Sequence, residues 1–515
     1  MAPAPRNDGW HAHSKVFFAC GIMLLCPFQY GIDFTLIGGL QAMVPFLQVY
    51  GYQDHTAPIG WNISTVRQQL ITSLMTLGAF ISSGTAGVSA TKFGRRHCLW
   101  LACVLCCIAN ILMMATTNVG ALYTGRFLIG LANGYFMTFS QLYIHETSPA
   151  KYRGLFLTVF QFFTSFGAVI GGIIDWATAK RPDKSAFLIP LSIVYVVPVI
   201  VGIVMFFIPE SPRWLILQGR YKDGVKALER IRPVDHDSNA EAEEIRAAIE
   251  RERETTGSAG ILDMFSNPVD RRRTILSVCA VMIQAASGSM FIIAYLAYFL
   301  AMANVEDPFA MSNVIGALGM VAIILSSFIV VRWGRRRVLL ITGLILCGVL
   351  QLITAVVYDK NPGTSTTGKV LVALSALYVM SYSGLIAAYA WLAGGEIPSQ
   401  RLRSYTFGLA AAVSFFGGWL TTFTAPYFIN PESLNWGPRY GYIWFPSAII
   451  AAAWVWFFLP ELKGRTLEEI NEMFLAKLPA RKFRTYKCIG NNNIRAAEKN
   501  EGVEVQMVEK ADDKV

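Results

Sequence analysis

Long apolar runs constrain the fold of this chain more than any other feature. Each run approaches the roughly 20 residues that a helix needs to cross the hydrocarbon core of a bilayer. Because a segment in lipid must satisfy its own backbone groups, the sequence predicts an all-α polytopic membrane protein with twelve transmembrane helices. The predicted spans are 16–40, 68–91, 98–116, 121–144, 155–177, 187–208, 273–300, 311–332, 337–357, 370–394, 405–428 and 440–459.

Charged residues are scarce and unevenly distributed. They make up 15% of the 515 residues, against about 25% in soluble proteins. Lys and Arg fall mainly in alternate loops, although 178–186 departs from the pattern, and the positive-inside rule then predicts that both termini are cytoplasmic. The net charge of +10 therefore reflects membrane topology, and we expect no nucleic-acid partner.

The chain also repeats itself. "FGRRH" at 93–97 recurs as "WGRRR" at 333–337, and "HETSPAKYRG" at 145–154 recurs as "GEIPSQRLRS" at 395–404. This repeat maps the first six spans onto the last six, which predicts two pseudo-symmetric six-helix bundles related by an axis along the membrane normal. The expected domains are a cytoplasmic N-terminal tail (1–15), a first bundle (16–208), a cytoplasmic helical loop (209–272), a second bundle (273–459) and a cytoplasmic C-terminal tail (460–515).

Within the long loop, Ser238 with Glu241 three residues later has the spacing of a capping box and predicts a helix start; a disordered linker is the alternative. Cys103-x-x-Cys106 has a redox or metal spacing but lies inside an apolar run with no His or carboxylate near it. We interpret it as packing. No metal-ligand cluster or nucleophile–base pair is evident, so we expect no metal, no cofactor and no enzyme activity.

The motifs in this order resemble the sugar porter family of the major facilitator superfamily, over about residues 16–475. The resemblance rests on "GRR" after spans 2 and 8, Glu-x6-Arg after spans 4 and 10, "PESPRWL" after span 6 and "PELKGRTLEEINEMF" after span 12. "EIPSQRLRSYT" at 396–406 resembles the fungal branch that includes α-glucoside (maltose) and hexose permeases. The implied fold is the major facilitator fold.

The resemblance implies a charged cytoplasmic gate, in which Arg and carboxylate groups pair across the two halves when that side is closed. The gate residues are Arg95, Arg96, Glu146, Arg153, Glu210 and Arg213, and in the second half Arg335, Arg336, Glu396 and Arg403. The family usually has an acidic residue three before the Gly of each "GRR", where this chain has Thr91 and Val331. We therefore expect a weaker gate.

Two charged residues lie deep within predicted spans, Asp33 and Arg126. Such residues cost about 2.5–3.5 kcal/mol at the centre of a membrane helix on insertion scales, so they usually face a cavity and pair. In proton-coupled sugar porters an Asp in span 1 sits beside an Arg in span 4, and these residues match those positions. The resemblance implies proton coupling, since separating the pair would favour protonation of Asp33. A purely structural buried pair is the alternative.

Sugar contacts of the family match Gln161, Gln284 and Trp391, and Tyr295 resembles an outer-gate tyrosine. Other family contacts are replaced, by Ala285, Met290, Gly319, Ser414 and Phe415, so the resemblance does not carry hexose specificity over. "NIS" at 62–64 makes Asn62 a glycosylation candidate in the first outer loop.

We therefore expect a sugar:proton symporter, monomeric and multi-pass in the plasma membrane, whose partners are a small-molecule sugar, protons and the lipid bilayer. The sugar would be a hexose or an α-glucoside-type disaccharide. A proton-independent facilitator, a polyol or quinate porter, and a sugar sensor that does not transport are the alternatives.

Overall fold

The computed structural model describes residues 13–486, apart from 56–59, 234–235, 257–259, 303–304, 306, 333–334, 362–363, 400, 431–432, 464 and 466. Ten helical segments in this part of the chain are long and apolar enough to cross a membrane. One of them, Thr65–Ala115, contains two predicted spans, and the helix Val119–Thr147 coincides with a further one. The prediction of an all-α polytopic fold with twelve spans is therefore confirmed.

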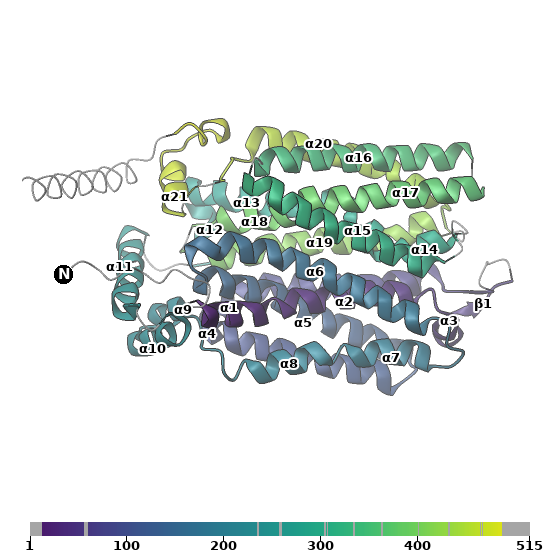
Figure 1. Cartoon of the computed structure of the whole chain (residues 1–515), viewed down its shortest axis with the longest axis horizontal. Coiled ribbons are helices and arrows are strands. Elements are labelled where there is room, and N and C mark those ends of the chain that lie inside the picture. The colour runs from purple at the N-terminus through teal and green to yellow at the C-terminus, as the bar shows by residue number, and fades with distance from the viewer. Residues whose placement is uncertain are drawn as a thin grey trace, which may run out of the picture.

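The helices run side by side along the long axis of the molecule and form two adjacent bundles (Figure 1). The first bundle contains α1 (Ser14–Met23), α2 (Leu25–Leu40), α4 (Thr65–Ala115), α5 (Val119–Thr147), α6 (Ala150–Thr178), α7 (Ser185–Ile193) and α8 (Val196–Val204). The second contains α13 (Pro268–Ala286), α14 (Ser289–Met302), α15 (Pro308–Arg332), α16 (Arg336–Lys360), α17 (Ser365–Tyr382), the π-helical turn η1 (Ser383–Ala387), α18 (Ala388–Glu396), α19 (Arg403–Ile429), the 3-10 turn η2 (Gly437–Tyr440) and α20 (Gly441–Phe458).

The two ends of the molecule differ. One end, here called the loop-helix end, carries α9 (Pro212–Leu217), α10 (Tyr221–Ile231), α11 (Ser238–Thr256), α12 (Asp263–Ser266), α21 (Leu467–Leu475) and the 3-10 turn η3 (Ala480–Lys482). The opposite end, the hairpin end, carries α3 (Val44–Tyr50) and the antiparallel strands β1 (Tyr52–Gln53) and β2 (Trp61–Asn62) (Figure 1).

Gly94 divides α4 into the two predicted spans. A straight helix of 51 residues would be about 76 Å long, far more than a bilayer core of about 30 Å, so the chain must turn within it. Gly94 has φ 81° and ψ 177°, a conformation that is essentially restricted to glycine. The "GRR" motif therefore begins at the one residue type that can make this turn.

The two halves approach closely where small residues face each other. A side chain at Gly87 of α4 would meet Tyr405 of α19, and one at Gly408 of α19 would meet the backbone of Ser83 in α4. Small residues let membrane helices pack with little space between their backbones. The helices α4 and α19 form one inter-half contact, and α6 with α15 and α2 with α14 form others.

The predicted helix start at Ser238 is correct, but the capping residue lies one position earlier. Asp237 Oδ1 accepts hydrogen bonds from the backbone N–H groups of Asn239 (3.1 Å) and Ala240 (3.0 Å). Glu241 instead pairs with Arg232, whose Nη1 also donates to Thr147 O at the end of α5 (3.0 Å). The charge that suggested a capping box thus helps to attach the loop helices to the first bundle.

Candidate functional site

Asp33 lies deep in α2, with only 2% of its surface exposed. Gln29, one turn earlier on the same helix, donates from Nε2 to Asp33 Oδ1 (2.9 Å). Asn133 of α5 donates from Nδ2 to Asp33 Oδ2 (2.7 Å). Both carboxyl oxygens are therefore held by neutral amide donors, one of them on another helix.

Arg126 is also buried, but its hydrogen bonds run elsewhere. Its Nε donates to Ile71 O of α4 (3.1 Å), and its Nη2 lies 3.1 Å from the sulfur of Met75. Among the ion pairs of the described residues there is none between Arg126 and Asp33. The structure thus brings Asp33 to Asn133, and Arg126 stands two helical turns before Asn133 on α5.

Asn133 is a site residue that the sequence interpretation missed. It follows Arg126 by seven residues, a spacing that places both side chains on one face of a helix. An amide at this spacing from an intramembrane arginine is the signal that could have identified it. The carboxamide supplies a hydrogen-bond donor without adding charge.

Two of the predicted sugar-contact residues bind each other. Trp391 Nε1 donates to Gln284 Oε1 (2.9 Å), and Gln284 Nε2 donates to Ala387 O at the end of the π-helical turn η1 (2.7 Å). Pi-helical turns inside α-helices frequently occur at functional sites. Tyr295 is buried in α14 and donates its hydroxyl hydrogen to Thr422 O of α19 (2.8 Å). The second half therefore presents a preorganised amide–indole pair.

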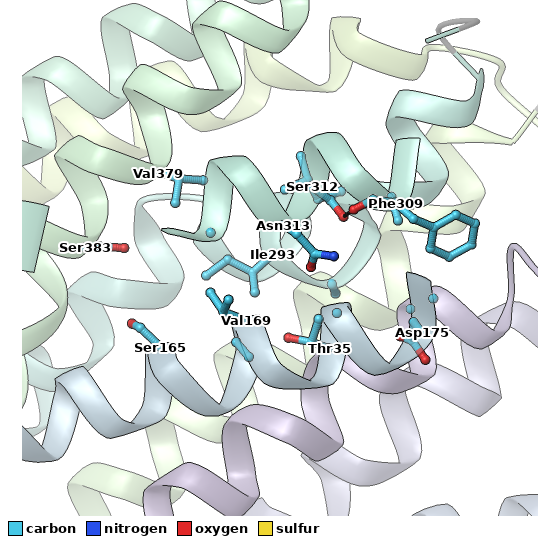
Figure 2. Close-up of a pocket in the computed structure, with 18 residues that line it drawn as sticks. Thr35, Ser165, Val169, Asp175, Ile293, Phe309, Ser312, Asn313, Val379 and Ser383 are labelled. Atoms are coloured by element: carbon cyan, nitrogen blue, oxygen red, sulfur yellow. Dashed lines mark hydrogen bonds between the residues drawn. The ribbon is translucent and has the colours of Figure 1, made fainter. Parts of the chain in front are cut away.

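A cavity of about 100 Å³ lies between the two halves, lined by α2, α6, α14, α15 and the α17–η1 junction. Figure 2 shows Ser165 and Val169 on one wall and Ser312 and Asn313 on the facing helix. Neither the three predicted sugar-contact residues, Gln161, Gln284 and Trp391, nor Tyr295 line this cavity. Gln161 is one turn before Ser165 on α6, so it stands beside the end of the cavity.

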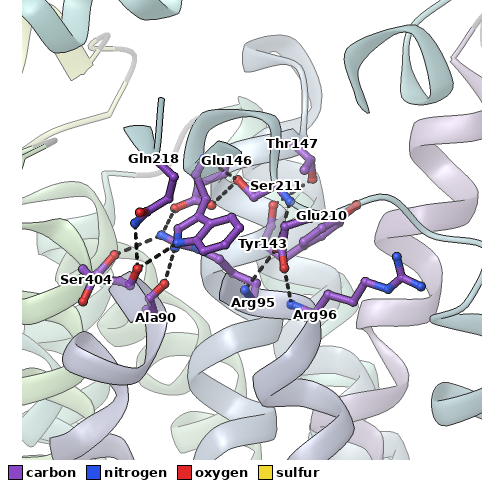
Figure 3. Close-up of polar contacts among 12 residues, drawn as sticks. Ala90, Arg95, Arg96, Tyr143, Glu146, Thr147, Glu210, Ser211, Gln218 and Ser404 are labelled. Atoms are coloured by element: carbon purple, nitrogen blue, oxygen red, sulfur yellow. Dashed lines mark hydrogen bonds and ion pairs between the residues drawn. The ribbon is translucent and has the colours of Figure 1, made fainter. Parts of the chain in front are cut away.

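At the loop-helix end of the first half, Arg95 and two carboxylates form a network (Figure 3). Arg95 Nη2 pairs with Glu146 Oε1 (2.5 Å), and Ser211 donates to Glu146 Oε2 (2.5 Å). Glu210 accepts the backbone N–H groups of Arg95 (3.0 Å), Arg96 (3.0 Å) and Ser211 (2.9 Å). Glu210 therefore caps the helix that restarts after Gly94, where a negative charge is favoured.

The second half contains a corresponding network, but its arginines are shifted by one residue from the alignment of "FGRRH" with "WGRRR". Arg336 pairs with Glu396, as Arg95 pairs with Glu146. Glu461 Oε2 accepts the backbone N–H of Arg337 (3.1 Å), as Glu210 accepts that of Arg96. Arg337 thus occupies the place of Arg96, whereas the side chain of Arg335 is exposed before α16. The role of Arg335 in the gate stays a prediction.

The ion pairs of these two networks each join residues of one half. One link between the halves, among the residues that the structure describes, is a hydrogen bond from Arg95 Nη2 to Ser404 Oγ (3.2 Å). Arg403 is buried at the start of α19, and Arg213 lies in the first turn of α9. The side chain of Arg153 falls outside the described residues.

The hairpin end is linked across the halves by uncharged groups. Asn430 Nδ2, at the end of α19, donates to Gln68 Oε1 of α4 (2.8 Å), and the hydroxyls of Thr65 and Ser433 are 3.3 Å apart. Asn62 lies nearby in β2, where its Nδ2 donates to Asp54 (3.2 Å) and its Oδ1 accepts the backbone N–H of Ile63 (2.8 Å).

The model of the family described as "Sugar (and other) transporter" matches residues 19–474. The chain belongs to this sugar transporter family. The matched part contains both bundles, Asp33, the amide–indole pair and both charged networks. The expected sugar porter membership in the major facilitator superfamily is therefore confirmed, and the chain is a transporter rather than an enzyme. The narrower maltose branch stays a prediction.

Among its relatives in the sugar transporter family is the major facilitator-type transporter ecdD of Aspergillus rugulosus, 26% identical over 87% of this chain and 85% of that one. The low-affinity glucose transporter HXT1 of Saccharomyces cerevisiae is 26% identical over 92% and 84%. A solved structure of the proton:xylose symporter XylE superposes with a TM-score of 0.74 at 19% identity, covering 90% of this chain and 100% of that one. At this identity, the similarity to XylE shows a shared fold alone.

Proposed function

We propose that this family member imports a sugar, a hexose or an α-glucoside-type disaccharide, by proton symport with alternating access. It would act as a monomer in the plasma membrane, with the loop-helix end and both termini in the cytoplasm. The buried carboxyl of Asp33, bonded to Asn133 on a neighbouring helix, is the observation that carries the proposal. Glucose transport by HXT1 and proton:xylose symport by XylE, as their names state, support it.

Coupling requires that the proton affinity of one group depends on conformation. The bond between Asp33 and Asn133 joins α2 to α5, so a shift between these helices would remove one of the two donors that stabilise the carboxylate. Gln29 lies on the same helix as Asp33 and would move with it. In this mechanism, displacement of α2 favours proton uptake, and return of Asn133 favours release. Arg126 would act through its charge, as the sequence predicted.

Alternating access requires that each end opens by breaking inter-half contacts. At the loop-helix end the bond from Arg95 to Ser404 would break, and at the hairpin end the bond from Asn430 to Gln68 would break. Each bond has a modest net free energy, about 1–3 kcal/mol for one with a charged donor and about 1 kcal/mol for a neutral one. Contacts of this strength can break and form again as the transporter alternates between its two conformations.

The test is accumulation of labelled D-glucose and maltose in transporter-null yeast at two external pH values. Wild-type uptake should exceed the external concentration and collapse on adding an uncoupler. Asp33→Asn should abolish accumulation, whereas Asp223→Asn, in a solvent-exposed pair with Arg220, is the matched control. Concentrative uptake by Asp33→Asn would exclude the coupling role. Uptake that equilibrates and ignores the uncoupler would favour a facilitator, and quinate or polyol uptake without sugar uptake would favour the other porters.

Glycosylation of Asn62 belongs to the same proposal, because the assigned orientation puts β2 outside the cell. An enzyme that removes N-linked glycans should increase the gel mobility of the wild type and leave that of Asn62→Gln unchanged. Absence of a shift in the wild type would contradict this modification.

A further inference from the structure

The cavity between the halves contains buried polar groups that no described residue satisfies. Asp175 of α6 lines it and is 1% exposed, yet both of its carboxyl oxygens lack a hydrogen-bond partner. The hydroxyl oxygen of Thr35 of α2, also in the lining, lacks one as well. Buried polar atoms in native proteins are almost always paired with protein, water or ligand, so each exception requires an explanation.

Glycines on the neighbouring helices make room for the polar side chains of this cavity. A side chain at Gly39 of α2 would collide with the Asp175 carboxyl, and Gly39 is one turn after Thr35. On the opposite side, a side chain at Gly172 would collide with Asn313 Oδ1 of α15, and Gly172 is one turn before Asp175. The carboxyl, the hydroxyl and the amide therefore belong to one cavity, in which Figure 2 shows Thr35 and Asn313 between Ser165 and Asp175.

The cavity extends from this cluster toward the predicted sugar-contact position. Ser165 and Asp175 both line it and are separated by ten residues of α6, about 15 Å along the helix. Ser165 is one turn from Gln161. A solute entering from the hairpin end would meet Asp175 before it reached Gln161.

We propose that this cavity is an outer subsite for the transported solute, in which Asp175 and Thr35 bind neighbouring hydroxyl groups of an uncharged, polyhydroxylated solute. A carboxyl group and a hydroxyl group can each accept hydrogen bonds, and sugar hydroxyls supply the donors. The many apolar neighbours, Val169 and Ile293 among them, fit the carbon face of a sugar ring. The inference rests on the proposed function and narrows its solute class.

The experiment uses the purified full chain in proteoliposomes, with D-glucose and maltose as probes. Asp175→Asn should raise the KM for a transported sugar about threefold or more, because an amide nitrogen cannot accept a hydroxyl hydrogen, while kcat stays within about twofold. Thr35→Val should raise KM by about threefold or more. Neither variant should lower the midpoint of thermal unfolding, because neither removes a bond made within the protein. Asp183→Asn, on the exposed loop after α6, is the matched control.

An unchanged KM in a folded Asp175→Asn would overturn the subsite while leaving sugar transport intact. If Asp175→Asn does not fold, an unchanged KM in Thr35→Val overturns it.

Sugar-dependent thermal stabilisation separates binding from transport. D-glucose or maltose could stabilise the wild type but not Asp175→Asn, while the wild type takes up neither sugar. That result would refute the proposed transport and support the subsite. If the wild type neither binds nor takes up these sugars, the proposed sugar transport and the proposed subsite are both refuted.

Discussion

Glu210→Gln tests whether the "PESPRWL" carboxylate stabilises the first half from within. The carboxylate accepts three backbone N–H groups and is 9% exposed, so solvent screens it little. Hydrogen bonds to charged groups contribute roughly 1 kcal/mol more than neutral ones, and a charge at a partly buried helix N-terminus contributes up to about 2 kcal/mol. The side-chain amide in Glu210→Gln would also place its own N–H donors against these backbone N–H donors, with which they cannot form hydrogen bonds. We expect a loss of about 2–4 kcal/mol.

The repeat supplies a matched comparison for this variant. Glu461 accepts the backbone N–H groups of Arg337 (3.1 Å) and Lys463 (3.2 Å) and is more exposed than Glu210. Glu461→Gln should therefore cost about half as much. Glu229→Gln, on the exposed face of α10, controls for loss of a surface charge.

The assay is thermal unfolding of the purified variants in detergent, followed by tryptophan fluorescence. For a unit of roughly 200 residues, 1 kcal/mol lowers the midpoint by about 2–4 °C, so Glu210→Gln should lower it by roughly 5–10 °C. A decrease within about 1 °C of that for Glu229→Gln would refute the capping role. A larger decrease for Glu461→Gln than for Glu210→Gln would refute the reasoning from donor number and burial.

Three further predictions follow from the same end of the molecule. Gly94→Ala should destabilise the protein by about 1–3 kcal/mol, measured in the same unfolding assay, because φ 81° with ψ 177° is strained for alanine; an unchanged midpoint would contradict this. Ser404→Ala removes the bond from Arg95 across the halves, so labelling of single cysteines should show the loop-helix end open more often, with the unfolding midpoint nearly unchanged; unaltered labelling would remove its gating role. Burial raises the pKa of Glu241, but bonds to Arg232 and His236 outweigh it and hold the pKa below its usual value. The stability that Glu241 contributes is thus present above about pH 4.5 and lost as the pH falls further. The protection of the α11 amides against hydrogen exchange, measured relative to their intrinsic exchange rates, should therefore fall below about pH 4, and this fall should be absent in Glu241→Gln.

Much of the fold could be predicted because its determinants are local. Each span is a continuous apolar run, and the repeat is evident from similar sequence motifs in the two halves. The sequence also selected Arg95, Glu146, Arg336 and Glu396 as gate residues. It predicted that such charges pair across the halves, whereas Arg95 with Glu146 and Arg336 with Glu396 each form a pair within one half.

Other parts of the site depend on residues that approach from distant helices. The positions of the second-half arginines could be assigned only from the three-dimensional structure, because the backbone N–H of Arg337 rather than that of Arg336 donates to Glu461. The partner of Asp33 required it too: Arg126 was the obvious charge, but Asn133 makes the bond.

The sequence by itself determined that this chain spans a membrane in twelve helices and repeats one six-helix unit, because hydrocarbon thickness and backbone hydrogen bonding leave few alternatives. Only the tertiary structure decided which buried polar atoms are satisfied. Asp33 and Asp175 are both carboxyls in apolar helices, yet within the described part of the chain Asp33 has two amide donors and Asp175 has none. The difference arises from the residues that α5 and α2 bring against them, Asn133 in one case and Gly39 in the other. Helix packing, which no single stretch of sequence encodes, sets that choice.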